Sequence, residues 1–294
     1  MVVYSIKDLE KLSGVKAHTI RIWEKRYNLI QPKRTSTNIR YYTDDDLGKL
    51  LNVCILYRKG YKISKIAEMD PQMLLNKVST YSNLDLSFED QLDALMLFIL
   101  ELDSFNFNKV LDQHISQAGL EETMKGIIYP LLDKLSLAWL AGSFTGIHES
   151  FVAQIIRSKV LHCTEDLEDI IDSRPIYVIY LPMGEEQELS LLFLHFLLKK
   201  NKCKVINLGT EVNLQDIILA INKCKPDYLF TILNEETTQM PLQTYITKIT
   251  ESLGDSKLLV TGYQGVTAKI NWPDNVVQLQ NLEESLEYIK KSRK

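Results

Sequence analysis

An alternation of short apolar runs with helical patterns, beginning after Pro175, is the feature that most constrains the fold of this 294-residue chain. Strand-like and helix-like segments in alternation predict a doubly wound α/β domain, with a parallel sheet of about five strands. We expect this domain to span residues 175–294. Strands are expected at residues 176–182, 204–209, 228–233, 257–262 and 276–279, and helices at 186–200, 213–224, 242–253 and 282–294.

The turns after these strands are the expected place for a ligand, because open parallel sheets bind ligands beyond the carboxyl ends of their strands. The turn "GEEQELS", residues 184–190, carries three glutamates. They either line a ligand site or stabilise the start of the next helix through its dipole. No nucleophile elbow, P-loop or dinucleotide-binding glycine motif is present, so we do not expect an enzyme. The candidate walls are residues 182–187, 209–211, 231–234 and 262–265.

The middle of the chain shows apolar residues at helical spacing throughout. Short connections between such helices predict a four-helix bundle over residues 85–165, and a bundle of this size is usually a packing or dimerisation unit. The four expected helices are residues 88–103, 106–119, 120–142 and 145–163.

The charge distribution separates the N-terminal segment from the rest. Residues 1–70 hold 14 Lys and Arg against 8 Asp and Glu, which is a net charge of +6, and the remaining 20 basic and 30 acidic residues give −10. Between Lys11 and Tyr41, eight basic residues face a single acid, Glu24. A local basic patch on an acidic chain indicates contact with a polyanion.

The first 27 residues predict a helix-turn-helix. Ser5 is a plausible N-cap, Gly14 supplies the turn, and a second helix over residues 17–27 buries Ile20 together with either Trp23 or Ile22. The N-terminal residues of such a second helix can enter a major groove. Its outward positions hold His18, Thr19, Arg21, Lys25 and Arg26.

A wing is expected after this helix. Pro32 ends the helical region, the run Lys33–Arg34 leads into a polar loop, and "IRYY" returns as a short strand. Arg34 and Arg40 would then face phosphate or the minor groove. Thr43 is the predicted cap of the following helix.

The order of "TIRIWEKRY", the wing residues and "YRKGYKISKIAEM" resembles the MerR family of winged-helix transcription regulators over residues 1–72. The resemblance implies an oligomer, a dimer or possibly a tetramer by family analogy, that binds double-stranded promoter DNA. Ile39 departs from the family, where many members place an aromatic residue or histidine. The DNA-binding residues that we expect are Lys16, His18, Thr19, Arg21, Tyr27, Lys33, Arg34, Arg40 and Tyr42.

The remaining chain resembles the CarH/LitR class of cobalamin-binding regulators, whose C-terminal domain is Rossmann-like. In "WLAGSFTGIHES", Trp139 and Glu149 fall on positions that cover the corrin in that class, although Trp139 would equally suit a bundle core. The cobalt-ligating histidine position holds Gln187, and an amide oxygen is a weak ligand. Ser190 and Tyr263 replace two glycines of the motif. The corresponding degenerate cofactor site is Trp139, Glu149, Gln187, Thr231, Leu233 and Gly262.

We therefore expect a MerR-type regulator in which the C-terminal region serves as a sensor of an unknown small molecule or as an oligomerisation unit. No cofactor is expected; the alternative is a cobalamin-dependent light or cofactor sensor that holds the corrin without histidine. The four cysteines lack metal-site spacing, so no metal is expected. The N-terminus lacks a signal pattern, which favours a cytoplasmic protein without membrane contact.

Overall fold

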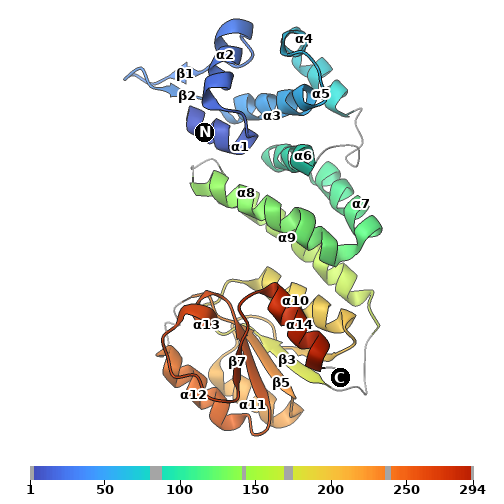
Figure 1. Ribbon diagram of the computed structural model, residues 1–294, viewed down its shortest axis with the longest axis vertical. Helices are drawn as coiled ribbons and strands as arrows, with labels where there is room; N and C mark the ends of the chain where they lie inside the picture. The colour runs from blue at the N-terminus through green and yellow to red at the C-terminus, as the bar shows by residue number, and fades with distance from the viewer. Residues whose placement is uncertain (1–2, 80–87, 141–143, 169–174, 236–239, 293–294) are drawn as a thin grey trace. The chain divides into compact units, whose positions relative to one another are not determined.

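The computed structural model describes residues 3–79, 88–140, 144–168, 175–235 and 240–292 (Figure 1). The chain divides into two compact units, residues 1–155 and 156–294. Among the helices of the described residues, none combines the length and apolar character that a membrane span requires.

The helix-turn-helix begins as the sequence predicts. Ser5 caps α1 (Ile6–Ser13) in a reciprocal capping box with Asp8, and Gly14 ends the helix with a left-handed φ of 70°. The second helix, α2 (Ala17–Tyr27), buries Trp23 rather than Ile22, which settles the alternative left open by the sequence.

The wing consists of β1 (Lys33–Arg34) and β2 (Arg40–Tyr41), paired antiparallel. Just beyond β2, Tyr42 exchanges two backbone hydrogen bonds of 2.9 Å with Tyr4, so the root of the wing is tied to the start of the chain. Thr43 and Asp46 then form the predicted capping box of α3 (Asp44–Arg58).

The expected bundle helices follow, with one irregularity. Gly119, where the sequence predicts a break between two helices, has non-helical angles (φ 81°, ψ 164°), and a π-helical turn that the sequence did not reveal comes shortly after it. The helices that complete this part of the chain are α4 (Ile63–Ala67), α5 (Pro71–Ser79), α6 (Phe88–Leu100), α7 (Ser104–Thr123), the π-helix η1 (Met124–Ile128), α8 (Tyr129–Leu140) and α9 (Gly146–Glu165).

A buried charge cluster joins α3 to the bundle helices within the first unit. Arg58 of α3 pairs with both Asp90 and Asp93 of α6, and Lys134 of α8 pairs with Asp93. The two aspartate side chains are almost completely buried. Burial raises the pKa of the Asp93 carboxyl, while Lys134 and Arg58 act in the opposite direction. Because a buried charge needs a partner, this cluster fixes how α3, α6 and α8 pack.

The second unit confirms the doubly wound parallel sheet and all five predicted strands. The strand order is β4-β3-β5-β6-β7, and every neighbouring pair is parallel. In this order the chain reverses direction across the sheet between β3 and β5, which is the switch point where such folds bind ligands. The strands are β3 (Ile176–Tyr180), β4 (Lys204–Asn207), β5 (Tyr228–Ile232), β6 (Lys257–Thr261) and β7 (Val276–Gln278).

Helices cover both faces of this sheet (Figure 1). Alternate residues of β3 point to opposite faces, so Tyr177 and Ile179 pack with α10 and α14, whereas Val178 and Tyr180 pack with α11 and α12. The helices are α10 (Glu188–Lys200), α11 (Leu214–Cys224), α12 (Leu242–Ser252), α14 (Leu282–Ser292) and a short α13 (Tyr263–Thr267) that the sequence did not predict.

Candidate nucleic-acid interface and C-terminal crevice

A side chain of α1 contacts the exposed start of α2. Glu10 accepts a hydrogen bond from the backbone N–H of Ala17 (3.2 Å) and pairs with the ammonium of Lys16 (3.3 Å). These contacts, the backbone N–H first, lower the pKa of the Glu10 carboxyl. Of the residues expected to bind DNA, Lys16, His18 and Arg21 are exposed, and Thr19 and Tyr27 are half-buried.

The wing presents two arginines opposite each other. Arg34 pairs in register with Arg40, and Lys33 with Tyr41. Arg34 donates to the carbonyl and the side-chain oxygen of Asn38 at the wing tip (3.2 and 2.8 Å). Arg40 instead directs its Nε toward Glu24 of α2, at 3.5 Å. All of Lys33, Arg34 and Arg40 are exposed, as a phosphate contact requires.

Tyr42 differs from the sequence expectation. Its side chain has no exposed surface, and its hydroxyl donates to Oε2 of Glu24 (3.1 Å). Burial and the charge of Glu24 raise the pKa of Tyr42 to about 12. A side chain without exposed surface makes no direct contact with DNA in this conformation. The Tyr42 backbone is bridged to that of Tyr4, which is itself completely buried, so residue 42 lies in the core and not on the wing surface.

In the second unit, Glu185 spans the switch point. It follows β3, and its Oε1 accepts hydrogen bonds from the backbone N–H groups of Asn234 and Glu235, which follow β5 (2.9 and 3.0 Å). The side chain is 3% exposed, and Oε2 has no hydrogen-bond partner among the described residues. Burial raises the pKa of the Glu185 carboxyl, and the two N–H groups oppose that shift. The first glutamate of "GEEQELS" is therefore neither a cap nor an exposed ligand group.

Of the residues expected at a cofactor site, Thr231 and Leu233 are buried, and Gln187 and Gly262 are half-buried. Gln187 is the N-cap of α10 but makes no capping hydrogen bond with its side chain. Thr231 and Leu233 are completely buried, and the Thr231 hydroxyl donates to the carbonyl of Tyr180 (3.1 Å). At Gly262 a Cβ would lie 2.6 Å from the carbonyl oxygen of Leu233, so the turns after β5 and β6 touch each other there. Tyr263 does not fill this space, because it is 67% exposed.

Two tyrosines occupy the interior beneath these turns. The hydroxyls of Tyr180 on β3 and Tyr245 on α12 lie 3.0 Å apart, and both rings are buried. A cavity of about 30 Å³ remains beside Tyr245, lined also by Pro182, Met183 and Met240. A volume of this size holds about one water molecule. This pair was not singled out by the sequence, since its members are 65 residues apart.

The two bundle residues expected at the cofactor site lie on the surface of the first unit. Trp139 of α8 is 47% exposed, and Glu149 of α9 is exposed. The neighbouring His148 accepts a hydrogen bond at Nδ1 from the backbone N–H of Thr145 (3.2 Å), which caps α9. Burial lowers the pKa of the His148 imidazole. Trp139 is thus not a core tryptophan of the bundle.

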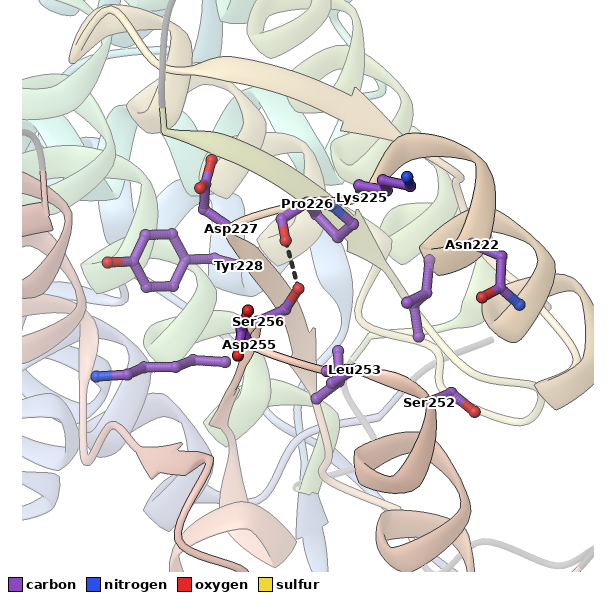
Figure 2. Close-up of a pocket in the computed structure, with 12 residues that line it drawn as sticks. Asn222, Lys225, Pro226, Asp227, Tyr228, Ser252, Leu253, Asp255 and Ser256 are labelled. Carbon is purple, nitrogen blue, oxygen red and sulfur yellow. Dashed lines mark hydrogen bonds between the residues drawn. The ribbon is translucent and has the colours of Figure 1, made fainter.

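A larger pocket of about 510 Å³ lies at the opposite end of the sheet (Figure 2). It is formed by the segments that lead into β5 and β6, and the Ser256 hydroxyl donates to the carbonyl of Pro226 across it. Its charged residues have mixed sign, with Lys225 and Lys257 beside Asp227 and Asp255. Because ligands of this fold bind at the carboxyl ends of the strands, we do not regard this pocket as the functional site.

The expected ligand position offers the amide of Gln187, and amide oxygens are weak donors to cobalt. The turns after β5 and β6 meet at Gly262.

Known proteins resemble this chain both in its N-terminal segment and over most of its length. Residues 4–72 match the family model described as MerR HTH family regulatory protein. The chain is 25% identical over 237 residues to the HTH-type transcriptional repressor CarH of Myxococcus xanthus, covering 77% of each chain. It is 21% identical over 225 residues to the repressor CarA of the same organism, covering 76% of this chain and 73% of CarA. A solved corrinoid protein of Methanosarcina barkeri aligns with a TM-score of 0.47 and 10% identity, over 67% of this chain and 96% of that protein.

A winged helix-turn-helix with an exposed basic second helix defines the class of DNA-binding transcription regulators, and the N-terminal domain belongs to the MerR family. The chain as a whole is similar, over about three quarters of its length, to the HTH-type transcriptional repressors CarH and CarA.

Proposed function

We propose that this regulator binds a promoter or operator through α2 and the wing. The observation that supports the proposal is the joint exposure of basic side chains on both elements, with Arg21 on α2 and Arg34 and Arg40 on the wing. Helix residues read base edges in the major groove, and wing cations contact phosphates, which set the register on the duplex. The protein acts as a dimer or a higher oligomer on a palindromic site, as the family resemblance implies.

We further propose that the C-terminal region acts without a histidine-ligated corrin. Gln187 at the ligand position and the closed turns at Gly262 support this proposal. The region then serves as a sensor for another small molecule or as an oligomerisation unit, and the protein is a regulator rather than an enzyme. A cobalamin-dependent sensor remains the competing function, and a spectroscopic test of it is given in the Discussion.

The DNA-binding proposal is tested with a duplex selected from a random library by the purified wild-type protein. Combining Arg21→Ala with Arg40→Ala removes one contact on each element, and each such contact is worth about 1–3 kcal/mol, so affinity should fall by about 30-fold or more. The dependence of log affinity on log salt should also become shallower by about one phosphate contact, that of Arg40 on the wing. Fluorescence anisotropy measures both quantities.

The control is a double variant with the same loss of charge elsewhere on the first unit. Lys49→Ala and Lys109→Ala change two exposed lysines on α3 and α7. Their effect should be the small, sequence-independent loss expected from net charge alone. Unchanged operator affinity in the arginine double variant would overturn the assignment of the interface.

A further inference from the structure

The only acidic residue among eight basic ones, Glu24, lies where it contacts both parts of the proposed reading surface. It belongs to α2, yet both of its carboxylate oxygens are used by residues of the wing strand or its root. Oε1 lies 3.5 Å from Nε of Arg40, and Oε2 accepts the Tyr42 hydroxyl at 3.1 Å. A carboxylate at this place would repel DNA phosphates. A role that favours binding is therefore needed to explain its presence.

The carboxylate is fixed from the protein interior. Tyr42 has no exposed surface and is held by two backbone hydrogen bonds to Tyr4, and the Tyr4 hydroxyl in turn donates to Asp44 at 2.6 Å. The Glu24 side chain itself is only 16% exposed. An ordinary surface ion pair contributes little, because two flexible side chains must be ordered to form it. Here one partner is already ordered, so only Arg40 has to be immobilised.

Arg40 needs such a partner because of its position in the wing. It lies directly opposite Arg34, and like charges at paired positions of two strands repel each other. Arg34 is held by Asn38 at the wing tip, and Arg40 is drawn toward α2 by Glu24. The two guanidinium groups are therefore kept by separate partners.

The contact leaves Arg40 free to bind DNA. A guanidinium carries five N–H donors in a rigid fork, and the pair with Glu24 is made at Nε. The two terminal nitrogens carry four further donors that can bind a phosphate. Arg21, one turn before Glu24 on α2, lies close enough to Tyr42 for its charge to act on that hydroxyl. The charges of Arg21 on α2 and Arg40 on the wing thus both act on the tyrosine that Glu24 binds.

We propose that Glu24 is a positioning residue for DNA recognition, which sets the orientation of Arg40 on the wing relative to α2. It does not touch DNA and acts through Arg40. This inference rests on the proposed function, and it adds that specific binding depends on a negative charge inside the basic surface.

The test is Glu24→Gln, measured by anisotropy with the selected operator duplex and with an unrelated duplex. Glutamine can still accept the Tyr42 hydrogen bond but loses the charge that holds Arg40. If Glu24 were only a repulsive charge, its removal would tighten binding to both duplexes. If it positions Arg40, operator affinity should fall by about fivefold, the upper range for an ion pair of this kind, while affinity for the unrelated duplex stays equal or rises.

Asp45→Asn is the matched control, because Asp45 is an exposed acid of the same domain that is outside the interface. It should leave operator affinity equal or slightly higher. In an Arg40→Ala background, Glu24→Gln should have no further effect on operator binding, and Arg40→Lys should resemble Glu24→Gln because one ammonium lacks the fork. Thermal unfolding followed by circular dichroism verifies that each variant is folded.

An operator affinity that rises in Glu24→Gln as it does in Asp45→Asn would overturn the positioning role while leaving the DNA-binding proposal intact. A loss of equal size with and without Arg40 would also overturn it. A wild-type protein that selects no duplex would instead refute the proposed function, and this inference with it.

Discussion

Glu24 and Glu185 are two half-buried or buried carboxylates that each join segments far apart in the sequence, yet their surroundings are opposite. Glu24 is fixed by a buried tyrosine and turns one oxygen outward to an exposed arginine. Glu185 binds two backbone N–H groups and keeps its second oxygen buried without a partner among the described residues. The first arrangement prepares cations for a ligand, and the second closes two turns onto each other.

The comparison teaches that a position typical of binding does not by itself indicate a binding site. The switch point of the sheet is where ligands of this fold bind, but there the Glu185 carboxylate is used to hold the turn after β5. The wing instead presents exposed donors on Lys33, Arg34 and Arg40. Exposed polar side chains that other residues hold in place are the better indicator of a binding site.

The largest expected effect is on cobalamin binding. Its outcome could contradict the contrast drawn between the Glu24 and Glu185 regions. Protein incubated with adenosylcobalamin or hydroxocobalamin in the dark and then desalted should show no corrin in its visible spectrum. The Gln187→His variant sharpens the result. Because the turns touch at Gly262, we expect this variant to stay colourless as well.

A retained corrin spectrum in the wild-type protein would contradict the closed crevice and favour the cobalamin-dependent sensor. Uptake by Gln187→His alone would mean that the turns open and that only the ligand has been lost.

The next largest effect lies in the charge cluster between α3, α6 and α8. Arg58→Ala removes the guanidinium that pairs with both buried aspartates, while Lys134 still pairs with Asp93, so the free energy of unfolding should fall by about 3–5 kcal/mol. Urea denaturation followed by circular dichroism measures the change. Lys65→Ala, which breaks the exposed Lys65–Glu68 pair, should cost about 1 kcal/mol or less. Equal losses in the two variants would show that the cluster is not desolvated.

The smallest effect is a pH dependence at Glu185. Burial raises the pKa of this carboxyl in the folded protein, so the folded state binds a proton more tightly than the unfolded state. Stability should therefore decrease as pH rises from the ordinary glutamate pKa through the raised value. Glu185→Gln, which can still accept both N–H groups, should flatten this part of the profile. Urea midpoints of the two proteins across that pH range provide the test, and parallel profiles would contradict the assignment.

Local sequence signals predicted the elements well. Ser5 and Thr43 cap their helices with acids three residues later, and all five strands of the sheet follow from short apolar runs. Such signals depend on neighbours within a few residues. The short α13 and the π-helical turn after Gly119 were missed, because neither has a composition that distinguishes it from its surroundings.

The errors and omissions at the candidate sites have a common physical cause. Tyr42 has the same strand phase as Arg40, yet its bridge to Tyr4 buries it. Glu185 is one of several glutamates in its turn and is distinguished only by the N–H groups of Asn234 and Glu235. In both residues a contact across a long stretch of chain determines the environment, and no local pattern records it.

The backbone bridge between Tyr4 and Tyr42 also has a consequence for how the chain matures. Its two ends enclose α1, α2 and the wing, so it closes a loop that spans most of the DNA-binding segment. Closing such a loop costs entropy before any contact rewards it, and non-local contacts therefore form late. Glu24 can therefore meet the Tyr42 hydroxyl in its buried position only after residue 42 has been made and has paired with Tyr4.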